Sequence, residues 1–175
     1  MSELVNRPQT MVDIYRLLPE GTPIQVIDNE FYMSPAPNFS HFDVVDRIVD
    51  ELKKIVARKN SGRVIFAPVA VFLGDKNAVQ PDIFFISTEN ANIIREEGIF
   101  GAPDLIIEVL SKGNANADLV KKKAIYEAFG IKEYFIVDPD NKSVITYFFD
   151  NHTYVEQTTQ QGRLISRVLG EDIGF

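Results

Sequence analysis

The sequence predicts an α/β fold in which a central mixed β-sheet is sandwiched by α-helices. Segments rich in Val, Ile and Phe alternate with two helical stretches, residues 41–59 and 117–129. Residues 105–110 form a nearly continuous apolar run, typical of a strand covered on both faces. Strands flanked by amphipathic helices favour a sheet with helices packed on its faces. No repeat, low-complexity tract or change of composition interrupts the chain, so residues 1–175 are expected to form one domain.

The N-terminal segment predicts a short helix followed by two strands. The helix is expected over residues 11–18, because the turn sequence Pro19-Glu20-Gly21 follows it. Residues 24–28 and 30–33 predict strands on either side of Asp28-Asn29. A loop rich in proline and serine then leads to the clearest helix of the chain.

This helix is expected over residues 41–59. Its apolar side chains recur at spacings of three and four and therefore form one stripe, with charges opposite. They are Phe42, Val45, Ile48, Val49, Leu52, Ile55 and Val56. Ser40 with Asp43 three residues later predicts a capping box at the start, and Ser61-Gly62 follows the end.

The rest of the chain predicts further strands and a second helix. Strands are expected over residues 63–73, 83–86, 105–110, 134–137 and 144–149, with weaker strands from Thr153 onward. Asn116 is available to cap the helix 117–129, and Gly130 suits the left-handed position after it. The sequence 138–141, Asp-Pro-Asp-Asn, favours a turn between the last two of these strands.

Composition and charge exclude several classes of function. Hydrophobic residues make up 45% and charged residues 25%, the usual balance of a globular domain. The absence of cysteine excludes a disulfide framework, a thiolate metal site and a cysteine nucleophile. The net charge of −7 argues against a broad phosphate-binding surface, although a local basic patch remains compatible with it. Neither a membrane-spanning segment nor a secretory signal is found, so a cytoplasmic protein is expected.

Two carboxylates in the strands are the first candidates for chemistry. Glu108 lies within the apolar run, where a carboxylate is costly unless it is paired or bound to a metal. Asp82 follows Pro81 at the start of another strand. Carboxylates from neighbouring strands can converge on Mg²⁺, but an ion pair for Glu108 and turn chemistry for Asp82 explain each residue alone. Asp104 is interpreted as structural, because four residues along a strand separate it from Glu108 by roughly 13 Å.

The second helix carries three polar side chains on one face. Asp118, Lys122 and Tyr126 recur at intervals of four. A helix-stabilising Asp–Lys pair with a packed tyrosine explains them without function. Alternatively, the lysine reaches a phosphate oxygen or the attacking water, because the helix directly follows the Glu108 strand. The chain's only concentrated basic patch consists of Lys112, Lys121, Lys122 and Lys123.

In combination these residues resemble the Uma-two family of restriction-endonuclease-like proteins, a branch of the PD-(D/E)XK nuclease superfamily. The matching segments are Gln80-Pro81-Asp82, residues 101–111 (GAPDLIIEVLS), Asp118 with Lys122 and Tyr126, and residues 130–139 (GIKEYFIVDP). The Asp28-Asn29-Glu30 turn and His41 also fit the pattern. Asn29 and Phe135 depart from it mildly, because the family commonly has glycine and tryptophan at these positions.

The resemblance implies a restriction-endonuclease-like core and a metal-dependent endonuclease that hydrolyses DNA. It implies that Asp82 and Glu108 bind Mg²⁺ or Mn²⁺. Leu110 stands where the superfamily usually carries lysine, so Lys122 becomes the candidate that assists the attacking water. The remaining fitting residues would line the same cleft as secondary residues: Glu30, His41, Asp118 and Tyr126.

A different class of function is compatible with the same fold. A non-catalytic binding or oligomeric module would also suit the acidic net charge. The two hypotheses differ in whether Asp82 and Glu108 converge on a metal ion. A homodimer is a further expectation, because the 13 phenylalanines could form an interface, although they could equally form the core.

Overall fold

The structure, a computed structural model, describes residues 7–34, 36–111, 115–159 and 161–175, with residues 115–118 and 159 described by their backbone alone. The helices are α1 (Met11–Tyr15), α2 (Phe39–Lys59) and α3 (Ala115–Ala128), with a 3₁₀ turn at Thr88–Ile93. The strands are β1 (Ile24–Ile27), β2 (Glu30–Met33), β3 (Gly62–Phe66), β4 (Val71–Leu73), β5 (Asn77–Val79), β6 (Ile83–Ser87), β7 (Ile94–Arg95), β8 (Gly98–Phe100), β9 (Leu105–Val109), β10 (Glu133–Val137), β11 (Val144–Asp150), β12 (Thr153–Thr159), β13 (Arg163–Ser166) and β14 (Glu171–Gly174).

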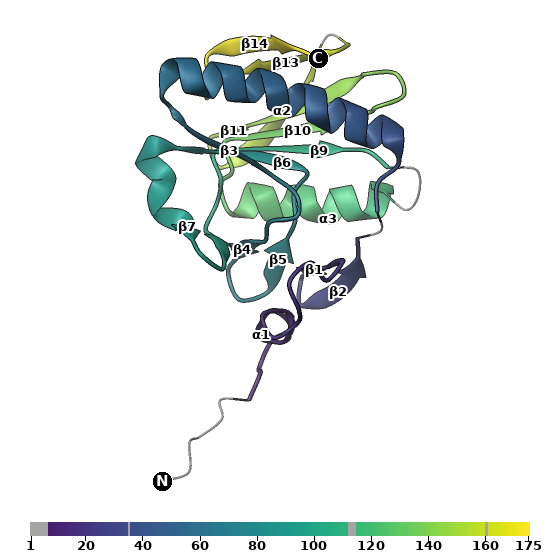
Figure 1. Cartoon of the computed structure of the whole chain (residues 1–175), viewed down its shortest axis with the longest axis vertical. Coiled ribbons are helices and arrows are strands. Elements are labelled where there is room, and N and C mark those ends of the chain that lie inside the picture. The colour runs from purple at the N-terminus through teal and green to yellow at the C-terminus, as the bar shows by residue number, and fades with distance from the viewer. Residues whose placement is uncertain (1–6, 35, 112–114, 160) are drawn as a thin grey trace.

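The central sheet confirms the expected α/β architecture. It has six strands in the order β12-β11-β10-β9-β6-β3, and it is mixed because β9 and β10 are parallel while the other pairs are antiparallel. Helix α2 covers one face and helix α3 the other (Figure 1). Strands β13 and β14 form a small separate hairpin beside α2.

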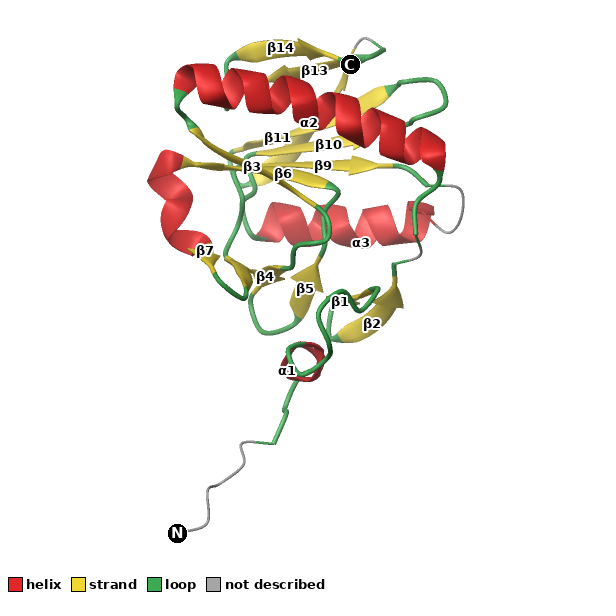
Figure 2. Cartoon of the chain, in the orientation of Figure 1, coloured by secondary structure: helices red, strands yellow, loops and turns green. Residues whose placement is uncertain are grey.

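A second six-stranded sheet, β2-β1-β5-β4-β8-β7, lies on the α3 side of the central sheet (Figure 2). The sequence predicts one sheet and does not indicate β5, β7 or β8. These strands contain only two or three residues each, too few to show the alternation of a strand.

The strand expected over residues 63–73 is instead two strands. β3 pairs with β6 in the central sheet, whereas β4 pairs with β5 and β8 in the second sheet. Residues 67–70 connect them and contain Pro68, which has no N–H for a strand ladder. The apolar run therefore joins two strands of different sheets, of which β4 is buried throughout and β3 is only partly covered.

Helix α2 begins earlier than expected. Its N-cap is Asn38, whose side-chain oxygen accepts the His41 N–H at 2.9 Å, so the Ser40–Asp43 capping box is wrong. An asparagine cap satisfies one of the free N–H groups of the first turn in the same way as serine. None of the described helices is long and apolar enough to span a membrane.

The core divides into two layers because β9 alternates between the faces of the central sheet. Ile107 and Val109 pack in the layer that includes the buried side of α2. Ile106 packs in the layer that includes Ile125 and Tyr126 of α3. Glu108 follows the same alternation and therefore points toward α3.

Asp104 has a structural role at the opposite end of β9 from Glu108. Its carboxylate accepts the Ser87 N–H at 2.8 Å and the Lys132 ammonium at 2.6 Å. Burial raises its pKa, but the Lys132 and Ser87 hydrogen bonds outweigh this effect and hold the pKa below its usual 3.8.

Replacing Asp104 with alanine is expected to lower the free energy of unfolding by about 2 kcal/mol at pH 7, because the Ser87 N–H loses its partner. Since the folded pKa is lowered, this stabilisation is present above the ordinary pKa and is lost as the pH falls through the folded value. Urea denaturation should show a smaller difference between the two proteins at pH 3 than at pH 7. The exposed Asp46, changed to alanine, is the matched control.

Candidate active site

The site begins with two carboxylates at one end of a strand pair: Glu108 lies within β9, and Asp82 directly precedes β6. Strands β6 and β9 are antiparallel, with Ile83 opposite Ile107. Continuing this register by one residue sets Asp82 opposite Glu108. Directly opposed residues of antiparallel strands have Cβ atoms about 5 Å apart. The two carboxylates are therefore neighbours at the end of β9.

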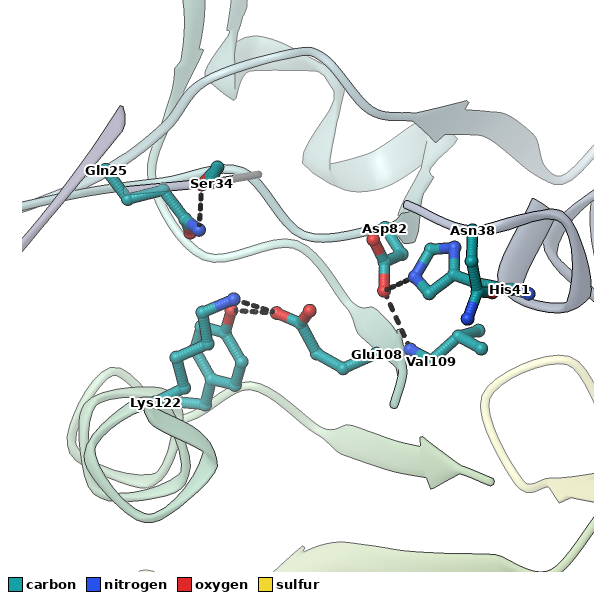
Figure 3. Close-up of polar contacts among 9 residues, drawn as sticks. Gln25, Ser34, Asn38, His41, Asp82, Glu108, Val109 and Lys122 are labelled. Carbon is teal, nitrogen blue, oxygen red and sulfur yellow. Dashed lines mark hydrogen bonds and ion pairs between the residues drawn. The ribbon is translucent and has the colours of Figure 1, made fainter. Parts of the chain in front are cut away.

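Asp82 lies where the chain crosses from the second sheet to the central sheet, between β5 and β6. Its Oδ2 accepts the Val109 N–H at 2.7 Å and the His41 Nε2–H at 3.1 Å (Figure 3). His41 must carry its proton on Nε2 to donate here, and its buried Nδ1 has no hydrogen-bond partner among the described residues. The Asp82 side chain remains 20% exposed, so solvent reaches it.

Glu108 has the opposite environment, because it is buried and held from α3. Its Oε1 accepts the Lys122 ammonium at 3.0 Å and the Tyr126 hydroxyl at 2.8 Å. Lys122 and Tyr126 are four residues apart and thus share one helix face. Glu108 is 5% exposed and Lys122 4%, so this is a buried ion pair (Figure 3).

The charges of these groups influence one another. Burial raises the pKa of Glu108 above its ordinary 4.5, the Asp82 charge raises it further, and Lys122 opposes both effects. Burial also raises the pKa of Tyr126 far above its usual range, so its hydroxyl keeps the proton that it donates. For His41, burial lowers the pKa, but the bond to Asp82 and the charges of Asp82 and Glu108 outweigh it and raise the pKa above 6.5.

Two of the expected secondary residues join these contacts, and Glu30 does not. His41 contacts Asp82, and Tyr126 contacts Glu108. Glu30 lies on β2 with its side chain 68% exposed, accepts the Tyr32 hydroxyl at 2.8 Å, and has the Lys121 ammonium at 3.7 Å. It therefore belongs to the surface beside α3. The backbone of Asp118 lies in α3, but its side chain is outside the described residues.

The lysines of α3 do not form one basic surface. Lys122 points inward to Glu108, whereas Lys121 hydrogen-bonds the Tyr32 hydroxyl and Lys123 lies 4.2 Å from the centre of the Tyr147 ring. Lys112 is outside the described residues. The three described lysines of the expected basic patch therefore point in different directions around the helix.

Sequence reasoning missed a buried amide beside the site, that of Gln25 on β1. Its Oε1 accepts the Gln80 N–H at 2.9 Å, and its Nε2 donates to the Ser34 hydroxyl at 2.7 Å (Figure 3). The one available signal was a polar residue beside the apolar pair Val26-Ile27.

Comparisons with known proteins identify the family of the chain. The sequence model of the Uma2 (Uma-two) family, described as "Putative restriction endonuclease", matches residues 11–174. The chain belongs to the Uma2 family. Membership of Uma2 indicates a nuclease. A search of curated proteins finds no match.

A solved structure shows the same fold. It is the crystal structure described as a "putative nuclease belonging to DUF820", from Anabaena variabilis. The two chains superpose with a TM-score of 0.73 at 22% sequence identity, over 89% of this chain and 86% of that one. The Uma2 chain therefore has a known fold over most of its length.

Restriction-endonuclease-like families such as Uma2 generally use divalent metal ions. Within the part of the chain that the structure describes, no three His, Asp or Glu side chains are grouped as a metal site. Two carboxylates suffice for Mg²⁺, which is usually bound by one or two carboxylates with water and substrate phosphate completing its shell. Asp82 and Glu108 fit that mode, because each uses one carboxylate oxygen for its described hydrogen bonds.

A separate cavity of about 760 Å³ lies between α1, the β3–β4 connection and the β7–β8 turn. Its described lining includes Arg16 and three carboxylates, Glu20, Glu96 and Glu97, and does not include Asp82 or Glu108. A lining with three carboxylates and one arginine is a poor match for phosphate.

Proposed function

We propose that this chain is a metal-dependent endonuclease that hydrolyses DNA phosphodiester bonds, with Asp82 and Glu108 as ligands of Mg²⁺ or Mn²⁺. The observation that carries the proposal is the position of these carboxylates, with Asp82 directly before β6 and Glu108 in the neighbouring strand β9, and with the Lys122 ammonium 3.0 Å from Glu108. Membership of a nuclease family supports it.

The bound cation would stabilise negative charge on the phosphoryl oxygens and make a nearby water a better nucleophile. Lys122 would orient the attacking water and offset phosphate charge. Its ammonium has a defined position because it is held against Glu108 in a buried site. A charge held in place before the reaction is worth more than a mobile one, since no reorganisation is required when charge develops.

His41 and Tyr126 would act through the carboxylates. The His41 bond holds Asp82 Oδ2 toward the end of β9, which leaves Oδ1 for the cation. The Tyr126 hydroxyl similarly holds Glu108 Oε1 and directs Oε2 away from α3. Both are positioning residues in this proposal.

Titration calorimetry with Mn²⁺ tests the proposal without a known substrate. The unmodified protein should show saturable binding at one or two sites. Asp82→Asn should raise the Kd by about a hundredfold, because it removes one of two charged ligands. Asp75→Asn, in the exposed β4–β5 turn, should bind as the unmodified protein does.

Unchanged affinity in Asp82→Asn would contradict the assignment of this residue as a ligand. Absence of Mn²⁺ binding, together with absence of Mg²⁺-dependent cleavage of plasmid DNA, would favour the non-catalytic module. The acidic net charge and the dispersed lysines of α3 are the observations compatible with that alternative.

A further inference from the structure

We propose that Gln25 is a positioning residue for Asp82, because it fastens the segment that carries Asp82 to the second sheet. Its consequence for catalysis rests on the function proposed above, whereas its effect on the position of Asp82 does not. Gln25 makes no described contact with Asp82 or Glu108 and would act through Gln80.

The burial of Gln25 requires an explanation. The residue is 6% exposed, and its neighbours Val26 and Ile27 are completely buried core residues. Placing an amide in such a strand is unfavourable unless its polar atoms are satisfied. Both are satisfied, but by two segments far along the chain from each other: Gln80 through its backbone N–H and Ser34 through its hydroxyl.

The hydrogen bond from the Gln80 N–H to Gln25 lies two residues before Asp82 along the chain. Gln80 follows β5, and Pro81 alone separates it from Asp82. Pro81 is buried and has a restricted φ angle, so a shift of Gln80 is transmitted to the next residue. On the far side, Asp82 is held by its carbonyl, which accepts the Ala67 N–H at 3.0 Å. Gln25 thus secures the second-sheet end of this crossing.

The hydrogen bond to Ser34 links Gln25 to the segment that leads to His41. Ser34 follows β2, and the chain leads from it to the α2 cap Asn38 and to His41, the partner of Asp82. One buried side chain therefore joins the segment before Asp82 to the segment before His41. Figure 3 shows Gln25 and Ser34 in the same view as both carboxylates.

Amide hydrogen exchange tests the positioning directly, because the Val109 N–H is held by Asp82 Oδ2. Gln25→Met keeps nearly the same volume and removes both hydrogen bonds. It should accelerate exchange of the Val109 amide about tenfold relative to the Leu110 amide, which bonds to the Val137 carbonyl instead. Ser34→Ala, which removes one bond, should have a smaller effect in the same direction. Gln157→Met, on the exposed face of β12, should have no effect.

Metal binding and turnover supply the functional readout. Gln25→Met should raise the Kd for Mn²⁺ about tenfold and lower kcat for DNA cleavage by about 10- to 100-fold, with KM within about threefold. A purely structural amide would lower the melting temperature and speed exchange of both amides equally.

If Gln25→Met accelerates exchange of the Val109 and Leu110 amides by the same factor, the positioning role is overturned. Selective Val109 exchange with unchanged Mn²⁺ affinity and kcat would overturn its functional consequence. If the unmodified protein neither binds Mn²⁺ nor cleaves DNA, the proposed function fails, and the exchange ratio still decides whether Gln25 positions Asp82.

Discussion

Glu108→Gln is expected to reduce metal-dependent DNA cleavage on the order of a thousandfold, the scale of losing a fixed charge at a reaction centre. The amide has the shape of the carboxylate, and its oxygen can still accept from Lys122 and Tyr126. It leaves the buried Lys122 ammonium without its counter-charge, so a loss of stability is expected together with the loss of cleavage. It lacks the negative charge that a divalent cation requires. Initial rates on supercoiled plasmid in Mg²⁺, with circular dichroism to verify folding, measure the effect.

Glu89→Gln is the matched control. Glu89 is an exposed carboxylate beyond Ser87, at the opposite end of β6 from Asp82. The cleavage rate of this variant should therefore equal that of the unmodified protein. The nuclease proposal is refuted if the Glu108 variant, purified in parallel, cleaves as fast as the control.

Lys122→Met is expected to destabilise the protein by about 3–5 kcal/mol at pH 7, because it leaves a buried carboxylate without its cation. Lys122 and Glu108 are both almost completely buried, so water cannot replace the lost charge. Lys54→Met removes an exposed ion pair with Glu51 and should change stability by about 0.5 kcal/mol or less. Urea denaturation at pH 7 distinguishes the two variants.

The loss in Lys122→Met should shrink at lower pH. Burial raises the folded pKa of Glu108, and removing Lys122 raises it further. The folded variant then binds a proton more readily than the unfolded chain, so its stability rises as the pH falls from the folded pKa toward the ordinary 4.5.

The double variant Lys122→Met/Glu108→Gln should recover much of the stability, because no buried charge remains. A single variant as stable as Lys54→Met, or a double variant no more stable than the single one, would contradict the account of a buried ion pair.

Features that depend on local spacing could be predicted from the sequence. The apolar periodicity of α2 predicted a helix with one buried face. The continuous apolar run of β9 predicted a strand covered on both sides. The intrusion of Glu108 into that run marked it as a buried carboxylate in need of a partner. The interval of four placed Lys122 and Tyr126 on one helix face, and both contact Glu108. These properties follow from helix and strand geometry, which neighbouring residues alone impose.

Contacts between segments that are distant along the chain became visible in the three-dimensional structure. Asp82 contacts His41 and Val109, which are 41 and 27 residues away along the chain. The division of the apolar residues 63–73 between two sheets likewise depends on which strands pair. Gln25 meets Gln80 across 55 residues, and its place beside Val26-Ile27 did not indicate that partner. Such contacts form because strand pairing and core packing bring remote segments together, so their residues carry no signal within a short window of sequence.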